Sequence, residues 1–263
     1  MLDERRREED STIMRNIKLV LAYDGSDFSG WQVQPDAVTI QGTLASVIGR
    51  VTGENVLPQG SGRTDAGVHA LGQVASFKTE SPIPAGNLLK ALNDILPASV
   101  RVLEAAEVDS EFHPRKSARA KTYRYRLYRA DICPPFLARY VWHHPYPLNE
   151  EAMEQAAVEV IGEHDFTSFA AVDPERGSEN DPRCNVRRIS SSGWHREGDE
   201  FVYEVRGNGF LHHMVRNLVG TFVLAGKGTL SPSEMVRILE ARNRCAAGAT
   251  APASGLYLVG VEY

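Results

Sequence analysis

Strand patterns and helix patterns alternate along this chain with short gaps between them, and this alternation most strongly restricts the folds available to it. Residues 15–23 read RNIKLVLAY, a β-branched and aliphatic run that ends at the turn residues Asp24, Gly25 and Ser26. From Ile40 onward, apolar side chains recur on one helical face, and Thr39 is the expected N-cap. The chain therefore begins with a strand followed by a helix.

The same mixture continues to the last residue. We expect further strands at residues 73–77, 99–108, 120–129, 186–195, 200–207 and 256–263, and further helices at 84–96, 149–161, 210–226 and 233–242. The gap REGD between two of these strands has the length of a hairpin, which favours antiparallel pairing. The pattern predicts an α+β fold in which helices pack against a mainly antiparallel sheet.

The length of 263 residues suits one large domain or two fused halves. We expect a disordered tail at residues 1–14, an N-terminal α+β half at 15–110 and a C-terminal α+β half at 111–263. The tail carries charges of both signs and no apolar run, so it is typical of neither a signal peptide nor a membrane anchor. One loop, residues 170–185, is rich in Pro, Gly, Ser and acidic residues.

Cysteine usage bears on the compartment. Cys133, Cys184 and Cys245 lie far apart, are odd in number and form no CxxC pair, which suggests neither a disulfide framework nor a zinc site. No window holds about eighteen uninterrupted apolar residues, which excludes an ordinary transmembrane helix. We therefore expect a cytoplasmic protein without a membrane partner.

Basic residues crowd into one segment, although the formal net charge of the chain is −5. Residues 112–129 contain seven of the 29 Lys and Arg residues and no acidic residue. Aromatic and basic side chains interleave along the strand at its end, an arrangement typical of proteins that bind single-stranded or loop RNA. A half-buried strand with a solvated basic face explains the same pattern, so both interpretations stay open.

A single acid stands out in the loop GRTDAG, where Asp65 lies between Gly62 and Gly67. The glycines permit a tight turn and the close approach of a ligand. Neither nucleotide-binding fingerprint is met, because a third glycine and a GK[ST] ending are absent. Arg63 would point the same way as Asp65 in an extended loop and would keep the acid ionised. From the residues alone, Asp65 is either a turn former or a nucleophile.

Metal and triad chemistry find little support in the pattern. The adjacent pairs His143-His144 and His212-His213 are expected to diverge, and no HExxH spacing occurs. A GxSxG elbow and a second carboxylate near Asp65 are also missing. We expect no metal site, which leaves Asp65 as a lone acid.

The order and spacing of six motifs closely resemble the TruA type of tRNA pseudouridine synthase. They are YDGSDFSGWQ at 23–32, GRTDAGVHA at 62–70, FHPRKSARAKTYRY at 112–125, DFTSF at 165–169, GFLHHMVRN at 209–217 and GLYL at 255–258. GRTDAGVHA is very specific, and the motifs together span nearly the whole chain. The resemblance implies a pseudouridine synthase fold, in which two ferredoxin-like or RRM-like halves join their sheets around a central basic cleft.

The resemblance also implies the roles of five site residues. Asp65 would be the catalytic nucleophile, which attacks the ribose or the base of a flipped uridine. Tyr123 would stack on the target base and assist proton transfer at carbon 5, and Arg216 would pair with Asp65. Arg63 would occupy the space that the displaced uridine leaves, and Leu256 would line the pocket.

Further contacts and partners follow from the same resemblance. The expected RNA contacts are Phe112, His113, Pro114, Arg115, Lys116, Arg119 and Lys121. The family isomerises uridines at positions 38–40 of the tRNA anticodon arm as a homodimer, without a metal or another cofactor. His69 and His113 are interpreted as loop-orienting or RNA-contacting residues. Two alternatives stay open: a noncatalytic RNA-binding module of the same shape, and a metal-dependent nucleic-acid hydrolase.

Overall fold

The computed structural model describes residues 14–172 and 185–263. All but the last residue of the expected tail at 1–14 lies outside the described residues, and so does most of the loop at 170–185. What the sequence predicts for these two segments therefore stays a prediction. Every helix in the described ranges is too short or too polar to cross a membrane.

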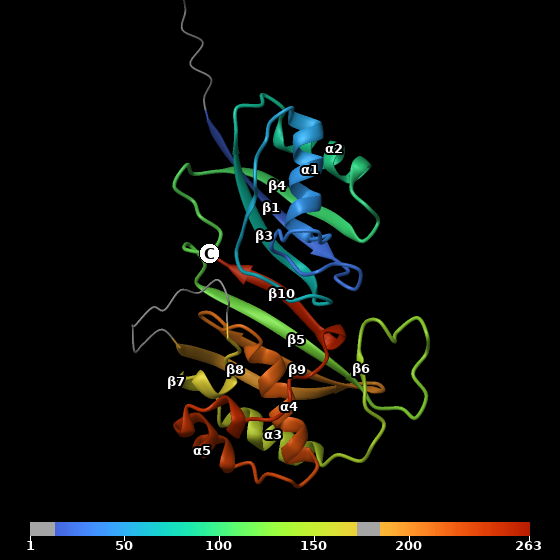
Figure 1. Ribbon diagram of the computed structural model, residues 1–263, viewed down its shortest axis with the longest axis vertical. Helices are drawn as coiled ribbons and strands as arrows, with labels where there is room; N and C mark the ends of the chain where they lie inside the picture. Colours follow the sequence, from blue (N-terminus) through green and yellow to red (C-terminus); the bar gives the residue numbers. More distant parts are fainter. Residues whose placement is uncertain (1–13, 173–184) are drawn as a thin grey trace, which may run out of the picture.

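Within the described residues, ten strands form one sheet and five α-helices pack against it (Figure 1). The strands are β1 (Arg15–Tyr23), β2 (Gln59–Gly60), β3 (His69–Thr79), β4 (Val100–Val108), β5 (Ala120–Tyr128), β6 (Trp142–His143), β7 (Gly162–Asp165), β8 (Val186–Glu197), β9 (Glu200–Gly207) and β10 (Leu256–Glu262). The helices are α1 (Ile40–Thr52), α2 (Ala85–Ile95), α3 (Glu150–Val158), α4 (Met214–Gly226) and α5 (Glu234–Ala241).

The strands run across the sheet in the order β4-β1-β3-β10-β5-β9-β8-β7, with β2 beside β3 and β6 beside β5. The pairs β3–β10 and β5–β6 are parallel, and the other pairs are antiparallel. This arrangement confirms the predicted α+β fold with a mainly antiparallel sheet.

Alternation along the strands decides which side of the sheet the helices cover. In β1 alternate residues from Ile17 to Tyr23 are buried, and in β5 Tyr123 and Tyr125 are buried on the same face. The register carries this face onto β10, because Leu258 lies opposite Tyr123. The helices α1 and α2 cover one end of this face and α3 to α5 cover the other (Figure 1). The part of the face above β10 and β5 lies between the two helix groups.

Local signals explain where the first helix begins and ends. The Thr39 hydroxyl accepts a hydrogen bond from the Gly42 N–H at 3.2 Å, which confirms Thr39 as the N-cap of α1. The helix ends at Gly53, whose left-handed φ of 78° suits glycine.

Element boundaries differ from the prediction in several places. Helix α4 begins at Met214 instead of Phe210, because His213 has a left-handed φ of 59° that interrupts the helix. Helix α3 ends at Val158 instead of Ile161, and β3 begins at His69, ahead of the predicted start at Gln73. The short strands β2, β6 and β7 were not predicted, because two to four residues show no period.

Strand β10 joins the strands of the first part of the chain to those of the second. It is the last strand in the sequence, yet it pairs with β3 on one side and with β5 on the other. Side chains from the first part and from the second part of the chain can therefore meet above β10. The division between residues 110 and 111 stays a prediction.

Candidate active site

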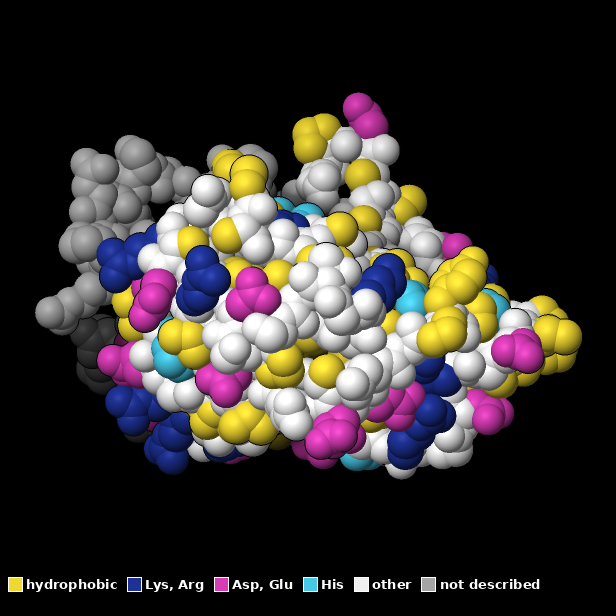
Figure 2. Space-filling model, turned by 90° about the horizontal axis from the view of Figure 1, so that it is seen from below, with side chains coloured by type: hydrophobic (Ala, Val, Ile, Leu, Met, Phe, Trp, Pro, Cys, Tyr) yellow, Lys and Arg dark blue, Asp and Glu magenta, His cyan; other side chains and the backbone are white. Residues whose placement is uncertain are grey.

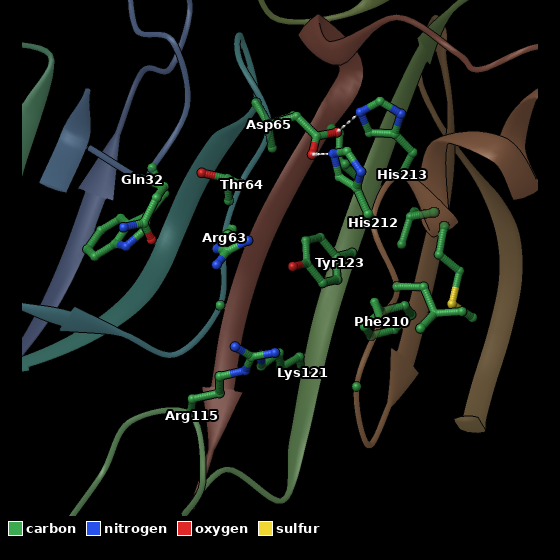
Figure 3. Close-up of a pocket in the computed structure, with 18 of the residues that line it drawn as sticks. Gln32, Arg63, Thr64, Asp65, Arg115, Lys121, Tyr123, Phe210, His212 and His213 are labelled. Carbon is green, nitrogen blue, oxygen red and sulfur yellow. Dashed lines mark ion pairs between the residues drawn. The ribbon is translucent and has the colours of Figure 1, made fainter. Parts of the chain in front are cut away.

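A cavity of about 860 Å³ opens on the helix-covered side of the sheet. Its lining combines the loop between β2 and β3, the first residues of β5, the segment that leads into α4, and Leu256 of β10. Figure 3 shows Arg63, Asp65, Tyr123 and His212 around this cavity. The segments are distant in the sequence, so only the fold brings them together.

Contacts of Thr64 hold the loop that carries Asp65. The Trp31 N–H donates to the Thr64 carbonyl at 3.0 Å, and the Thr64 hydroxyl hydrogen-bonds to the hydroxyl of Tyr23 at 2.8 Å. A Cβ on Gly30 would lie 2.7 Å from the same carbonyl, and Gly30 has a φ of +91°, so this position requires glycine. The segment 23–32 therefore supports the loop through the main chain of Trp31 and the side chain of Tyr23.

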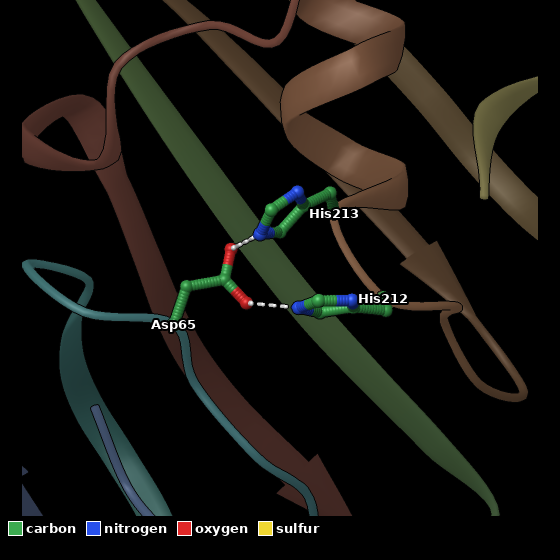
Figure 4. Close-up of side chains that lie close together, drawn as sticks. All are labelled: Asp65, His212 and His213. Carbon is green, nitrogen blue, oxygen red and sulfur yellow. Dashed lines mark ion pairs between the residues drawn. The ribbon is translucent and has the colours of Figure 1, made fainter. Parts of the chain in front are cut away.

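The carboxylate of Asp65 meets one guanidinium and two imidazoles. Arg216 Nη1 lies 2.7 Å from its Oδ2, His213 Nε2 lies 3.4 Å from Oδ2, and His212 Nε2 lies 3.7 Å from Oδ1. Figure 4 shows the two histidine rings on one side of the acid. The Asp65 side chain is 18% exposed and lines the cavity, so its oxygens are sheltered but accessible.

The histidines His212 and His213 do not diverge, which corrects the expectation from their adjacency. Their ring centroids lie 4.0 Å apart, and both Nε2 atoms face Asp65 (Figure 4). The expectation assumed regular strand or helix backbone, and His213 has neither, since it is the left-handed N-cap of α4. Both residues were missed as site residues, although they stand beside Arg216 in the motif GFLHHMVRN.

The protonation of the two rings follows from their surroundings. His212 Nδ1 lies 3.1 Å from the Val172 carbonyl, which can only accept, so Nδ1 carries the proton and Nε2 faces Asp65. Burial lowers the pKa of His213 below its ordinary value, and Asp65 acts in the opposite direction. His213 is therefore mainly neutral at neutral pH.

Arg216 connects Asp65 to the segment that precedes β10. Its Nη1 donates to Asp65 at 2.7 Å, and its Nε donates to the Ala251 carbonyl at 2.8 Å. The Ala251 N–H donates to the Arg216 carbonyl at 3.1 Å. A planar guanidinium with two fixed partners holds the carboxylate in one orientation. The close ion partner of Asp65 is thus the distant Arg216, whereas the spacing in the sequence suggested the neighbouring Arg63.

Tyr123 and Leu256 form an apolar side of the cavity. Their side chains are buried, and the ring of Phe210, which the sequence analysis missed, meets Tyr123 edge to face at a centroid distance of 4.9 Å. Burial raises the pKa of the Tyr123 hydroxyl, and Tyr23 and Asp65 raise it further. The hydroxyl therefore stays protonated at neutral pH and is a hydrogen-bond donor rather than a base.

The basic segment at 112–129 divides between two environments. Three of its cations pair with acids of β9 and α3: Arg124 with Glu204 at 2.9 Å, Arg126 with Glu200 at 2.5 Å, and Arg129 with Glu150 at 3.5 Å. Arg115 and Lys121 instead line the cavity. The strand pattern shows which cations share a face but not which of them have acidic partners on a neighbouring element.

The other expected RNA contacts lie outside this cavity. Phe112, His113 and Pro114 line a second cavity of about 340 Å³ beside β2 and β3. His113 Nδ1 accepts from the N–H groups of Arg115 and Lys116 at 3.1 and 3.3 Å, so it shapes their turn. Lys116 and Arg119 are exposed and, among the described residues, line neither of these two cavities.

His69 lies on the side of the sheet away from Tyr123 and belongs to a structural network. The Gly25 N–H donates to its Nδ1 at 3.1 Å, and its ring stacks on Tyr257 at 4.8 Å. Burial lowers the pKa of His69, so its ring is neutral and accepts the Gly25 hydrogen bond. This position supports the turn at Gly25, and His69 does not line the cavity that holds Asp65.

Asp65, His212 and His213 are also the described side chains that come closest to a metal site, because their ligand atoms lie within 4.8 Å of one another. The Arg216 guanidinium already binds one oxygen of Asp65 and would repel a second cation. The arrangement suits an ionised carboxylate better than a bound metal ion.

Comparison with known proteins finds similarity along almost the whole chain. A family model described as tRNA pseudouridine synthase matches residues 19–115 and 156–263. The tRNA pseudouridine synthase A of Solibacter usitatus is 53% identical over 250 residues, which cover 95% of this chain and 100% of that protein. Proteins of the same name from Halalkalibacterium halodurans and Caldicellulosiruptor saccharolyticus are 46% and 44% identical, over 92% and 95% of this chain and 90% and 100% of theirs.

Proposed function

The chain belongs to the tRNA pseudouridine synthase family, an isomerase family, and we propose that it converts uridine to pseudouridine at positions 38–40 of the tRNA anticodon arm. The resemblance of its six motifs to the TruA type supports this choice of positions. The proposed catalytic residue is Asp65, with Tyr123 and Arg216 beside it.

The ion pair between Asp65 and Arg216 inside the cavity carries the proposal. A turn-forming aspartate directs its oxygens at its own backbone. Both oxygens of Asp65 instead face side chains that arrive from another part of the fold. A carboxylate that is oriented by a guanidinium and opens into a cavity is arranged for nucleophilic attack.

The proposed reaction replaces the C1′–N1 bond of the nucleoside by a C1′–C5 bond. Asp65 attacks the ribose or the base, the bond between C1′ and N1 breaks, and the uracil turns. C1′ then bonds to C5, the bond between Asp65 and the nucleoside breaks and returns its electron pair to the carboxylate, the proton on C5 leaves, and N1 takes up a proton. Atoms and electrons balance, so the reaction requires no oxidant, water or cofactor. Tyr123 stacks on the base, and its protonated hydroxyl donates a hydrogen bond during these steps.

The target nucleotide must leave its stack to reach Asp65. Extrusion of a base costs a few kcal/mol, and it costs least in a loop or at the end of a stem, which suits the anticodon arm. A cavity of about 860 Å³ lies in the range of ~300–1,000 Å³ that is typical of ligand pockets. Tyr123, Phe210 and Leu256 provide its apolar walls, and Arg63 would take the place of the displaced base.

The flanking RNA would follow the basic side chains of the cavity and continue along residues 112–121. Arg115 and Lys121 supply charge at the cavity itself. The exposed Lys116 and Arg119 and the turn of Phe112, His113 and Pro114 would extend this path to more distant phosphates.

The variant Asp65→Ala tests the proposal on an unmodified tRNA transcript. We expect product formation to fall by about 10⁴-fold or more, because the attacking group is lost, while tRNA affinity changes little. Pseudouridine is mapped chemically at every uridine. Asp94→Ala, which removes an exposed acid on α2, is the matched control and should keep full activity. Undiminished turnover in Asp65→Ala would refute the catalytic role, and product at other uridines would refute the positions.

Two further outcomes would identify the alternatives. A noncatalytic RNA-binding module would bind the transcript and leave every uridine unchanged. A metal-dependent hydrolase would shorten the RNA and lose its activity in EDTA, whereas the proposed isomerase should keep full activity after chelation.

We also propose that the enzyme is a cytoplasmic homodimer, as the resemblance implies. Ile132 and Phe136 are 82% and 87% exposed on the loop between β5 and β6, and such apolar side chains are suited to a protein contact. Light scattering should give twice the chain mass of 29.0 kDa. A mass of a single chain at assay concentration would contradict the dimer.

A further inference from the structure

Lys121 links the strand of Tyr123 to the loop of Asp65. It lies on β5, two residues before Tyr123 and on the same face of the strand. Its Nζ donates to the Ser61 carbonyl at 2.6 Å, at the start of the loop that carries Asp65. A Cβ on Gly62 would lie only 2.8 Å from this Nζ, so the ammonium group sits directly against the loop backbone.

The start of the loop is held from the other side by β3. The Ser61 N–H donates to the Val74 carbonyl at 2.8 Å, and the Ser61 hydroxyl donates to Gln73 Oε1 at 2.6 Å. Gln73 Nε2 in turn donates to the Gly62 carbonyl at 3.0 Å. Lys121 is thus the contact from β5 to a loop that β3 otherwise positions.

The surroundings of Lys121 are rich in positive charge. Burial, together with the nearby charges of Arg115 and Arg187, lowers the pKa of Lys121 to about 8. Within the described residues, no carboxylate oxygen lies within 4.0 Å of its Nζ, whereas Arg124, Arg126 and Arg129 of the same segment have an acidic partner. Figure 3 shows Arg115 beside Lys121, with Tyr123 between this pair and Asp65.

A cationic group that lines a cavity and already uses one N–H on the protein has two N–H donors left for a ligand. The ligand class that fits is a phosphate, because a phosphate oxygen accepts from ammonium and guanidinium groups together and offsets their mutual repulsion. In the proposed function, such a phosphate belongs to the RNA strand on either side of the target uridine.

We propose that Lys121 is a positioning residue, which binds a backbone phosphate next to the target uridine while it holds the Ser61 carbonyl. Docking of the RNA backbone is thereby coupled to the orientation of the loop that carries Asp65. This inference rests on the proposed function, since it takes the RNA strand at the cavity as given.

Two substitutions separate the two contacts of Lys121. Lys121→Met removes both the phosphate contact and the Ser61 contact. Lys121→Arg keeps the charge, but a planar guanidinium does not fit where a compact ammonium lies against Gly62. We expect Lys121→Arg to keep RNA affinity within a few-fold and to lower kcat by about 10-fold or more, as for the loss of one charge-assisted hydrogen bond.

The decisive experiment is a methylphosphonate scan of an anticodon stem-loop. Each phosphate that flanks the target uridine is made neutral in turn. The dissociation constant and kcat are measured for the wild type, for Lys121→Met and for the control Lys90→Met, which changes an exposed residue of α2. At one position we expect wild type and Lys90→Met to lose about 10- to 100-fold in affinity, and Lys121→Met to lose less than about 3-fold.

Equal losses for wild type and Lys121→Met at every position would overturn the phosphate contact. Wild-type kcat in Lys121→Arg would overturn the coupling to the loop, and this variant decides the matter if Lys121→Met unfolds in a thermal melt. A wild type that binds the stem-loop but forms no pseudouridine would refute the proposed function instead, because the affinity scan does not depend on turnover.

Discussion

The two carboxylate oxygens of Asp65 have unequal partners. Among the described residues, Oδ2 contacts Arg216 at 2.7 Å and His213 at 3.4 Å, whereas Oδ1 lies 3.7 Å from His212. An oxygen whose lone pairs are less engaged is the better nucleophile. We therefore expect Oδ1 to be the attacking atom, with Arg216 as the group that holds the other oxygen still.

Arg216→Lys tests this orientation. The ammonium group keeps the charge but cannot serve Asp65 and the Ala251 carbonyl together, so the carboxylate loses its fixed direction. We expect kcat to fall by about 10- to 100-fold, with a smaller change in KM. Steady-state kinetics on a stem-loop measure both quantities. Arg237→Lys, on an exposed face of α5, is the matched control, and an unchanged kcat in Arg216→Lys would contradict the role.

RNA affinity should depend on pH through Lys121. Its pKa is lowered to about 8, so the free protein loses this proton as the pH rises through that value. A phosphate binds the protonated form, hence affinity is highest below about pH 8 and falls by at most about tenfold per unit above it. The charged groups around it in the cavity are Arg63, Arg115, Arg187 and Asp65. RNA affinity as a function of pH is measured on the inactive variant Asp65→Ala. Adding Lys121→Arg should remove the fall in affinity above about pH 8. The same fall in the double variant would contradict Lys121 as the titrating group.

At the scale of elements, α4 and the segment before β10 position Arg216 together. A Cβ on Gly220 would lie 1.8 Å from the Ala249 carbonyl, so the helix and this segment touch through their backbones. The Gly248 N–H also donates to the Thr221 hydroxyl at 2.9 Å. This close approach brings the Ala251 carbonyl to Arg216, which makes a packing glycine part of the support of the site.

Gly220→Ala should therefore damage both stability and catalysis. The added methyl group forces α4 away from the segment, and we expect the free energy of unfolding to fall by about 1–3 kcal/mol or more. Gly86→Ala on α2 is the control: nothing lies within 4 Å of its Cβ, and it should raise this free energy by up to about 1 kcal/mol. Urea unfolding measures the free energy of unfolding of each variant. A change in the same direction for Gly220→Ala and Gly86→Ala would contradict the packing argument.

At the scale of the whole molecule, the charge of the cavity lining differs from that of the face drawn in Figure 2. On the face in Figure 2, acidic and basic side chains are interspersed, and the net charge of the chain is −5. The described lining of the cavity instead holds four cations, Arg63, Arg115, Lys121 and Arg187, against the single acid Asp65. RNA is therefore expected to be attracted by one concave region and not by the protein as a whole.

The salt dependence of tRNA affinity should reflect the four cations that are proposed to follow the RNA backbone, which are Arg115, Lys116, Arg119 and Lys121. Each phosphate contact with a single strand contributes about 0.7 to the slope of log affinity against log salt, so four contacts predict a slope near −3. Arg115→Gln should reduce its magnitude by about 0.7, and Lys90→Met should leave it unchanged. Filter binding over a salt series gives the slopes, and a flat response in the wild type would exclude phosphate binding at this cavity.

Several features of this protein could be read from local pattern. The alternation in β1 and β5, the N-cap at Thr39 and the hairpin between β8 and β9 depend on residues close together in the chain, and the structure confirms them. The motifs likewise indicated the family that the comparisons show. The left-handed His213 could not be read in this way, because a positive φ in a residue other than glycine has no local sequence signal.

The sequence by itself determined the element types, the mainly antiparallel α+β class and the chemical identity of the side chains in the glycine loop. Only the tertiary structure decided which side chains meet: the pairing of Arg216 with Asp65 across 151 residues was implied by the family resemblance and not by any local pattern. Arg124 and Arg126 are paired with acids of β9, while Lys121 faces the cavity. Periodicity is a property of neighbouring residues, whereas the meeting of distant ones depends on strand order and on the few positions where the backbone leaves regular geometry.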